Sequence, residues 1–169
     1  MPILCVEGDP TFFALLERNA RAIGSVELEQ AFVEGPERGG VERGVGTARV
    51  VAGAEPLASK PLAQILDEHP AFTRPALIKL DTDGMDVPIL LANLPLLARL
   101  RPVLFFEYDP AVGAVPTIFD QLREAGYATA DWFENTGEHV GTLRLPEHLH
   151  DRYVGHRSAR YADVCVRPR

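Results

Sequence analysis

A short apolar segment that ends in acidic residues constrains this sequence more than any other feature. Residues 75–80 are apolar apart from Lys79, and Asp81, Asp83 and Asp86 follow directly. In open α/β sheets, ligands bind at the carboxyl ends of the strands, where loops present polar groups without burying them unpaired. The segment therefore predicts a strand whose end forms part of a functional site.

Two other segments repeat this pattern. The apolar residues 3–6 are followed by Glu7 and Asp9, and the apolar residues 103–106 are followed by Glu107. Because the carboxyl ends of parallel strands meet at one edge of a sheet, we expect the acids of all three segments to share one rim.

Extended and helical segments alternate along the chain. Hydrophobic spacing predicts strands at 3–6, 26–33, 47–52, 76–80 and 103–106, and helices at 11–23 (with Thr11 as N-cap), 61–68, 87–100 and 117–125. Residues 127–133, 140–145 and 161–166 predict an antiparallel final section with a turn at 135–137, and the glycine-rich residues 34–46 predict a loop. This order predicts one domain over residues 1–169, of the α/β class, with a doubly wound, mostly parallel sheet and an antiparallel C-terminal edge.

Composition excludes some classes of partner. The net charge is -7 and only two of the 17 basic residues are lysine, with no basic stripe, so we expect no nucleic-acid partner. The apolar runs are shorter than the roughly 20 residues of a membrane span, which favours a cytoplasmic protein without membrane contact. Cys5 and Cys165 lie in predicted strands without metal-site spacing, and we interpret them as buried, small apolar side chains.

Several segments resemble one family. Residues 78–86, Ile-Lys-Leu-Asp-Thr-Asp-Gly-Met-Asp, are a close version of the signature Lys-Ile-Asp-x-(Asp/Glu)-Gly-x-Glu. Residues 6–10 resemble a Glu-Pro-x-Pro segment, residues 16–19 a Leu-x-x-Asn, and residues 101–107 an Arg-Pro-x-(apolar)-x-x-Glu. Residues 132–143 and 161–165 resemble a closing hairpin and last strand. In this order the segments resemble the FkbM family of S-adenosylmethionine (SAM) dependent methyltransferases over nearly the whole chain.

The resemblance implies a Rossmann-like methyltransferase fold, SAM as cofactor, and methyl transfer to a hydroxyl of a small molecule or sugar-containing product. Glu7, with Asp9 beside it, would accept the ribose hydroxyls of SAM. Asp81, Asp83 and Glu107 would converge at the crevice, where neighbouring carboxylates raise one another's proton affinity and supply a general base for the acceptor hydroxyl.

Other interpretations of the same residues stay open. Lys79 is either paired with a nearby acid or a substrate contact, and Asp86 is a first-turn acid that complements the helix dipole. The acids could instead hold Mg²⁺ in a hydrolase or a metal-dependent methyltransferase. His148, His150 and His156 suggest either a metal site or, more simply, a solvated helix face.

The family places a strand and a Gly-rich loop ahead of the Glu-Pro segment, and the sequence begins too close to that segment to contain them. We therefore expect an N-terminally truncated domain in which the strands at Ile3 and Leu77 lack a neighbour. These two strands would pair directly, or a missing N-terminal segment or a second copy in a homodimer would complete the sheet. A non-catalytic scaffold or dimerisation module is the alternative function.

Overall fold

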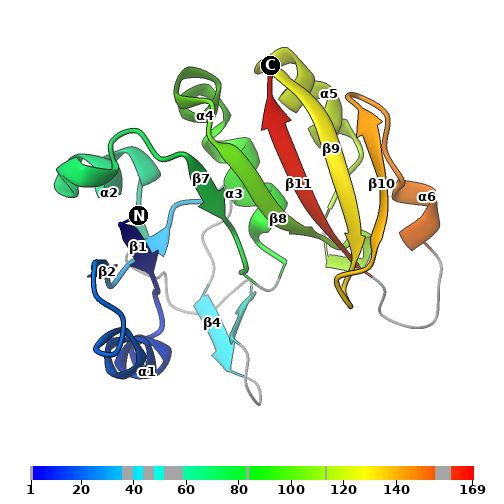
Figure 1. The fold of residues 1–169 in the computed structure, drawn as a ribbon. Coiled ribbons are helices and arrows are strands. Elements are labelled where there is room, and N and C mark those ends of the chain that lie inside the picture. Colours follow the sequence, from blue (N-terminus) through cyan, green and yellow to red (C-terminus); the bar gives the residue numbers. More distant parts are fainter. Residues whose placement is uncertain are drawn as a thin grey trace. The chain divides into compact units, whose positions relative to one another are not determined.

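The protein is described here from a computed structural model that covers residues 2–35, 40–43, 48–51, 59–82, 84–112, 114–154 and 161–169. The chain divides into two compact units, Met1–Arg74 (unit 1) and Pro75–Arg169 (unit 2). Both combine helices with strands, so the protein has a mixed α and β structure (Figure 1).

Unit 1 contains small, separate pairs of strands. Its elements are β1 (Ile3–Val6), α1 (Pro10–Ala20), β2 (Val26–Glu29), β3 (Phe32–Val33), β4 (Gly40–Arg43), β5 (Ala48–Val51), β6 (Ser59–Lys60), α2 (Leu62–Glu68) and the 3-10 helix η1 (Pro70–Phe72). Strand β1 pairs with β2 and β3 with β6, both in parallel, and β4 pairs with β5 in antiparallel fashion.

Three sequence predictions in unit 1 are wrong in part. The strand predicted at 26–33 is two short strands, β2 and β3, which pair with different partners. The loop predicted at 34–46 contains β4, and its residues 36–39 and 44–46 lie outside the described part of the chain. The N-cap of α1 is Asp9 rather than Thr11: its side chain accepts hydrogen bonds from the backbone N–H groups of Thr11 (2.7 Å) and Phe12 (3.2 Å). The physical reason is Pro10, whose fixed φ and absent N–H suit the first helical position and make the preceding residue the cap.

Unit 2 is built on a five-stranded sheet. Its elements are β7 (Leu77–Lys79), α3 (Asp86–Ala92), α4 (Leu94–Leu100), β8 (Val103–Tyr108), the 3-10 helix η2 (Pro110–Val112), α5 (Thr117–Glu124), β9 (Tyr127–Glu134), β10 (His139–Arg144), α6 (His150–Tyr153) and β11 (Ala162–Pro168). The strand order is β10-β9-β11-β8-β7. The β7–β8 pair is parallel and the other three pairs are antiparallel.

The sheet therefore differs from the mostly parallel one that the sequence predicts. Strand β11 lies between β8 and β9 and runs antiparallel to both, so the antiparallel section forms the larger part of this sheet rather than its edge. In the described residues β1 belongs to a two-stranded sheet with β2, and β7 belongs to the five-stranded sheet, so a single continuous sheet is not observed.

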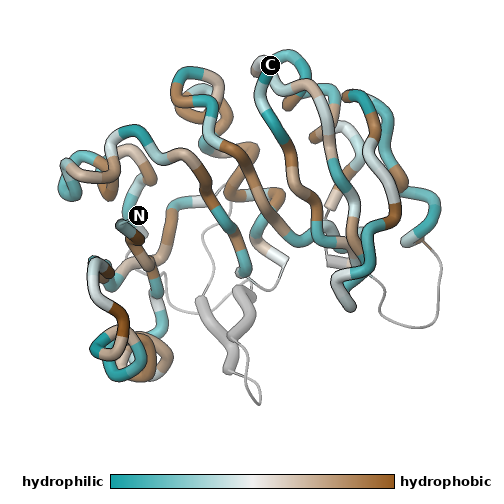
Figure 2. Tube along the Cα trace, viewed as in Figure 1, coloured by the Kyte–Doolittle hydropathy of each residue, from teal (hydrophilic) through white to brown (hydrophobic). Residues whose placement is uncertain are grey.

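The core of unit 2 lies on one face of this sheet. Alternate side chains of β8, namely Leu104, Phe106 and Tyr108, are completely buried against residues of α3, α4 and α5. The first four residues of β8, Val103 to Phe106, are all hydrophobic, and Figure 2 shows this part of the strand in brown. Because side chains alternate along a strand, the residues between these, Phe105 and Glu107, lie on the opposite face.

Two further differences concern helices and cysteines. The helix predicted at 87–100 is two helices, α3 and α4, separated at Asn93, because Pro95 has no N–H with which to continue α3. Cys5 and Cys165 are free thiols in strands, as predicted, but both are half-buried rather than buried.

In the part of the chain that is described, no helix has the length and apolar character needed to cross a membrane.

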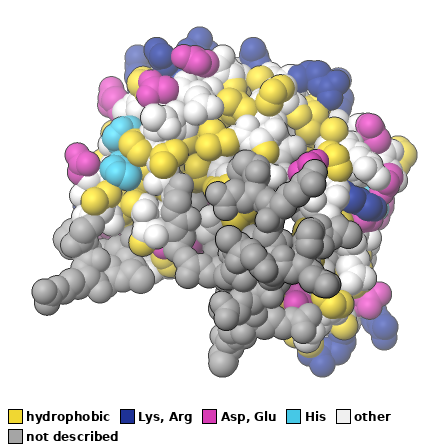
Figure 3. Space-filling view, turned by 180° about the vertical axis from the view of Figure 1, so that it is seen from behind, with side chains coloured by type: hydrophobic (Ala, Val, Ile, Leu, Met, Phe, Trp, Pro, Cys, Tyr) yellow, Lys and Arg dark blue, Asp and Glu magenta, His cyan; other side chains and the backbone are white. Residues whose placement is uncertain are grey.

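Some large hydrophobic side chains are exposed. On the face displayed in Figure 3, hydrophobic side chains gather between groups of charged ones. Among the residues whose side chains the structure describes, the large exposed hydrophobic ones are Ile3, Leu15, Ile23, Leu77, Val115 and Val154. Leu77 is notable because it belongs to β7, the strand at one end of the five-stranded sheet.

Candidate active site at the carboxyl ends of β7 and β8

The carboxyl ends of β7 and β8 lie side by side. The two strands are parallel with Lys79 opposite Phe105, and the N–H of Leu80 donates to the carbonyl of Phe105 at 2.8 Å. Asp81 lies two residues after the end of β7, and Glu107 lies near the end of β8. Two of the acids predicted from the sequence therefore come together at one edge of the unit 2 sheet.

A third acid joins them from a strand that the sequence does not connect to this edge. Asp163 of β11 is the direct antiparallel partner of Glu107, so both side chains lie on the same face of the sheet. Burial raises the pKa of the Asp163 carboxyl, and the negative charge of Asp81 raises it further, while Lys79 lowers it. Sequence reasoning missed this role, although Asp163 stands as a polar residue between the apolar Ala162 and Val164.

A tyrosine completes the group. Burial raises the pKa of the Tyr161 phenol, and the charges of Glu107, Asp163 and Asp81 raise it further. The phenol therefore stays protonated at neutral pH and is a hydrogen-bond donor. We call Asp81, Glu107, Asp163 and Tyr161 the acidic edge.

Lys79 lies beside the acidic edge as an ion-pair partner. Its ammonium contacts the carboxylate of Asp81, and the two side chains are 55% and 71% exposed. Lys79 is the last residue of β7 and Asp81 lies two residues further along the chain, so this ion pair is a local contact. The ion pair that the sequence suggested for Lys79 is therefore observed, and its role as a substrate contact stays a prediction.

Asp86 holds the loop after β7 against β8. The residue is 1% exposed, and its carboxylate accepts hydrogen bonds from the backbone N–H (2.9 Å) and hydroxyl (2.5 Å) of Thr82 and from the backbone N–H of Glu107 (3.1 Å). It is the first residue of α3, as expected of a first-turn acid, but its main contacts position the acidic edge.

Two further residues of the signature are Gly84, which the structure describes, and Asp83, which it does not. Gly84 has φ of 100°, a left-handed conformation that glycine adopts without strain. Asp83, predicted from the sequence as a catalytic acid, lies outside the described residues, and its role stays a prediction.

Glu7 and Asp9 lie in unit 1, at the turn after β1. One carboxylate oxygen of Glu7 accepts the backbone N–H of Asp9 at 2.7 Å, and Asp9 is 2% exposed because it caps α1. A Cβ on Gly8 would stand 2.3 Å from the ring of Phe32, so any larger residue at this position would overlap the ring unless the ring moved. The expectation that Glu7 shares a rim with Asp81 and Glu107 involves both units and stays a prediction.

The described residues do not favour a metal centre. Among them, no group of three or more His, Cys, Asp or Glu side chains is arranged to hold a metal ion. His148 is exposed and the Nδ1 atom of His150 lies 2.7 Å from the buried hydroxyl of Tyr108, which is a structural contact. His156 lies outside the described residues.

Comparison with known families identifies the class of protein. An α/β chain with a carboxylate-rich edge after parallel strands is compatible with many nucleotide- and cofactor-using enzymes. The profile of the methyltransferase FkbM domain matches residues 7–129, and the chain therefore belongs to the FkbM methyltransferase family.

The matched range covers all the site residues that the sequence predicts. It includes Glu7, Asp9, the signature at 78–86 and Glu107, and it ends within β9, before Asp163 and the segments at 132–143 and 161–165. No curated protein and no solved structure shows a significant match to the chain.

Proposed function

We propose that this chain is a SAM-dependent O-methyltransferase domain with a Rossmann-like fold, acting on a hydroxyl of a small molecule or sugar-containing product. The observation that carries the proposal is the convergence of Asp81, Glu107 and Asp163 at the carboxyl ends of β7 and β8. Family membership supplies the reaction class.

The acidic edge provides the proton acceptor. In the reaction, a bond forms between the acceptor oxygen and the methyl carbon, the bond from that carbon to the sulfonium sulfur breaks, and the hydroxyl proton leaves to a base. SAM supplies the activated methyl group, so the protein needs to supply only in-line positioning and deprotonation.

Asp163 is the residue best suited to take the proton. Burial and the nearby charge of Asp81 raise its pKa above the ordinary value of an aspartate, which makes the ionised carboxylate a stronger base toward a hydroxyl proton. Glu107, its register partner, accepts a hydrogen bond from a second hydroxyl of the acceptor, and Tyr161 donates one to another oxygen of the acceptor. Lys79 forms an ion pair with Asp81 beside them.

Glu7 is the proposed ribose ligand of SAM. Its side chain is fixed at the turn after β1 by the hydrogen bond from the Asp9 N–H, and a carboxylate offers two oxygens to two adjacent hydroxyls. Asp9 contributes indirectly, since its cap on α1 fixes the backbone that holds Glu7.

The test is transfer of a labelled methyl group from SAM to a panel of hydroxyl compounds that includes sugars and polyhydroxylated small molecules. We expect labelled product in the wild type and its loss in Asp163→Asn. Label incorporation into amine or carboxyl groups, with hydroxyl acceptors inert, would contradict the O-methyl assignment.

A second candidate function, a dimerisation module, rests on a different observation. Strand β7 ends the five-stranded sheet, and Leu77 on it is 49% exposed. An unpaired strand edge is a template for pairing with a second chain, so two copies could join along β7. Light scattering tests this: a dimer that Leu77→Lys weakens supports it, and a monomer at high concentration contradicts it.

A further inference from the structure

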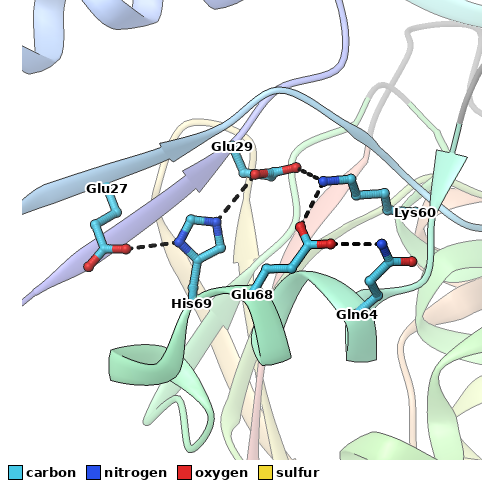
Figure 4. A network of polar contacts seen from close by, with 6 residues as sticks. All are labelled: Glu27, Glu29, Lys60, Gln64, Glu68 and His69. Carbon is cyan, nitrogen blue, oxygen red and sulfur yellow. Dashed lines mark hydrogen bonds and ion pairs between the residues drawn. The ribbon is translucent and has the colours of Figure 1, made fainter.

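We infer that protonated His69 holds the end of α2 against β2 and that this contact weakens as the pH rises. We call the contact of His69 with Glu27 and Glu29 the latch. The imidazole lies between two carboxylates of β2: Nδ1 is 2.8 Å from Glu27 Oε2, and Nε2 is 3.3 Å from Glu29 Oε2 (Figure 4). This device lies in unit 1 and is independent of the proposed methyl transfer.

The geometry itself sets the charge of the ring. A neutral imidazole has one N–H and one lone pair, so it can donate to only one carboxylate and turns its lone pair toward the other. An imidazolium donates from both nitrogens and satisfies both acceptors. Two carboxylate partners therefore favour the charged form of His69.

Because His69 and Glu29 are largely buried, the charge on the His69 ring has a strong effect on its contact with Glu29. The side chains of His69 and Glu29 are 14% and 15% exposed, so water replaces little of this contact when the ring loses its proton. The carboxylate of Glu27 raises the pKa of His69 most, burial lowers it, and Glu29 raises it, with a net increase.

The other charged groups around the ring belong to the same network. Lys60 of β6 contacts Glu29 and lies 2.8 Å from Glu68 of α2, and Gln64 donates to Glu68 at 2.7 Å. From η1 the ring meets Phe72 edge to face, with centroids 6.5 Å apart. Hence Lys60 and His69 are two cations that join strand β2 to α2, and only the histidine titrates near neutral pH.

This network matters because the described side chains of unit 1 bury little apolar surface. The buried hydrophobic residues described there are Ala31, Ile65, Leu66 and Phe72, and α1 has none. The polar contacts between β2 and α2 therefore contribute a larger share of the stability of unit 1 than polar contacts contribute to unit 2.

The direct test is an NMR titration of the histidine rings in the full chain, with His69 assigned from His69→Gln. We expect the His69 ring to stay doubly protonated at pH values where an exposed histidine is neutral, and to titrate at lower pH in Glu27→Gln. A wild-type His69 ring that is neutral at pH 6, or one that Glu27→Gln leaves unchanged, would overturn the inference.

Thermal unfolding provides the second measurement. The folded-state pKa of His69 is raised, so the latch contributes fully below the unfolded pKa of about 6.5 and is lost as the pH rises through the folded value. His69→Gln should lower the melting temperature by about 2–4 °C at pH 6 and by less at pH 9. The control His148→Gln, at an exposed position, should show no such difference, and equal losses for His69→Gln at both pH values would contradict the latch.

Discussion

Glu107 of β8 and Asp163 of β11 are direct partners in an antiparallel register, which places two carboxylates side by side on one face of the sheet. Placing two like charges directly opposite each other destabilises a sheet, and here Asp81 adds a third negative charge. An arrangement that opposes stability in this way is typical of a functional site, since active sites tune pKa values by burial and like charge.

Asp163→Asn should reduce methyl transfer by about 10²- to 10⁴-fold, because the amide cannot accept the hydroxyl proton. Affinity for SAM should stay unchanged, since Asp163 is not assigned to the cofactor. Initial rates at saturating SAM measure the first effect, and titration calorimetry measures the second. Asp120→Asn, at an exposed position on α5, is the matched control and should retain full activity.

The same substitution should stabilise the protein at pH 7. A carboxyl group with a raised folded-state pKa contributes stability below its unfolded pKa and loses it as the pH rises through the folded value. Replacing Asp163 by neutral Asn removes that loss, so urea unfolding should show a variant at least as stable as the wild type at pH 7. A large destabilisation would instead indicate a structural role for Asp163.

The rate should rise with pH through the raised pKa of Asp163, because only the ionised carboxylate is a base. The positive charge of Lys79 lowers that pKa, so Lys79→Gln should move the rising limb of the pH–rate profile to higher pH. An identical profile for the wild type and Lys79→Gln would show that another group controls the rate.

Asp86→Asn should destabilise unit 2 by about 1–3 kcal/mol, because an amide oxygen and a donor NH₂ group cannot accept all the hydrogen bonds that the carboxylate accepts from Thr82 and Glu107. Urea unfolding monitored by the fluorescence of Trp132 measures the change. Asp81→Asn is the comparison, since that side chain is largely exposed and should alter stability much less.

Gly8→Ala should destabilise unit 1 by about 1–3 kcal/mol, because the new Cβ would overlap the Phe32 ring. The double variant with Phe32→Leu should recover part of the loss, since the smaller side chain can yield. Gly24→Ala, where a Cβ meets nothing within 4 Å, should have little effect. Equal effects at Gly8 and Gly24 would contradict the close-packing explanation.

Local chemistry made much of the fold predictable from the sequence. Most strands and helices lie within a few residues of their predicted positions, and the turn at 135–137 forms around Gly137 with φ of 85°. The errors at Thr11 and at Asn93 both arise next to prolines, Pro10 and Pro95, whose effects on helix starts and ends outweigh hydrophobic spacing.

Long-range register was not predictable in the same way. The sequence indicated that Asp81 and Glu107 end parallel strands, because each follows an apolar segment directly. It gave no sign that β11 inserts between β8 and β9, and that pairing alone brings Asp163 to Glu107. Likewise, the contacts of Asp86 with Thr82 and Glu107 depend on the packing of α3 against β8.

Cofactor binding is the property on which the proposed function depends most. Isothermal titration of the chain with S-adenosylhomocysteine, the product form of the cofactor, measures it without knowledge of the acceptor. A methyltransferase domain predicts saturable heat with one site per chain, and weaker binding in Glu7→Gln. No heat exchange at millimolar S-adenosylhomocysteine would contradict the proposed activity for this chain.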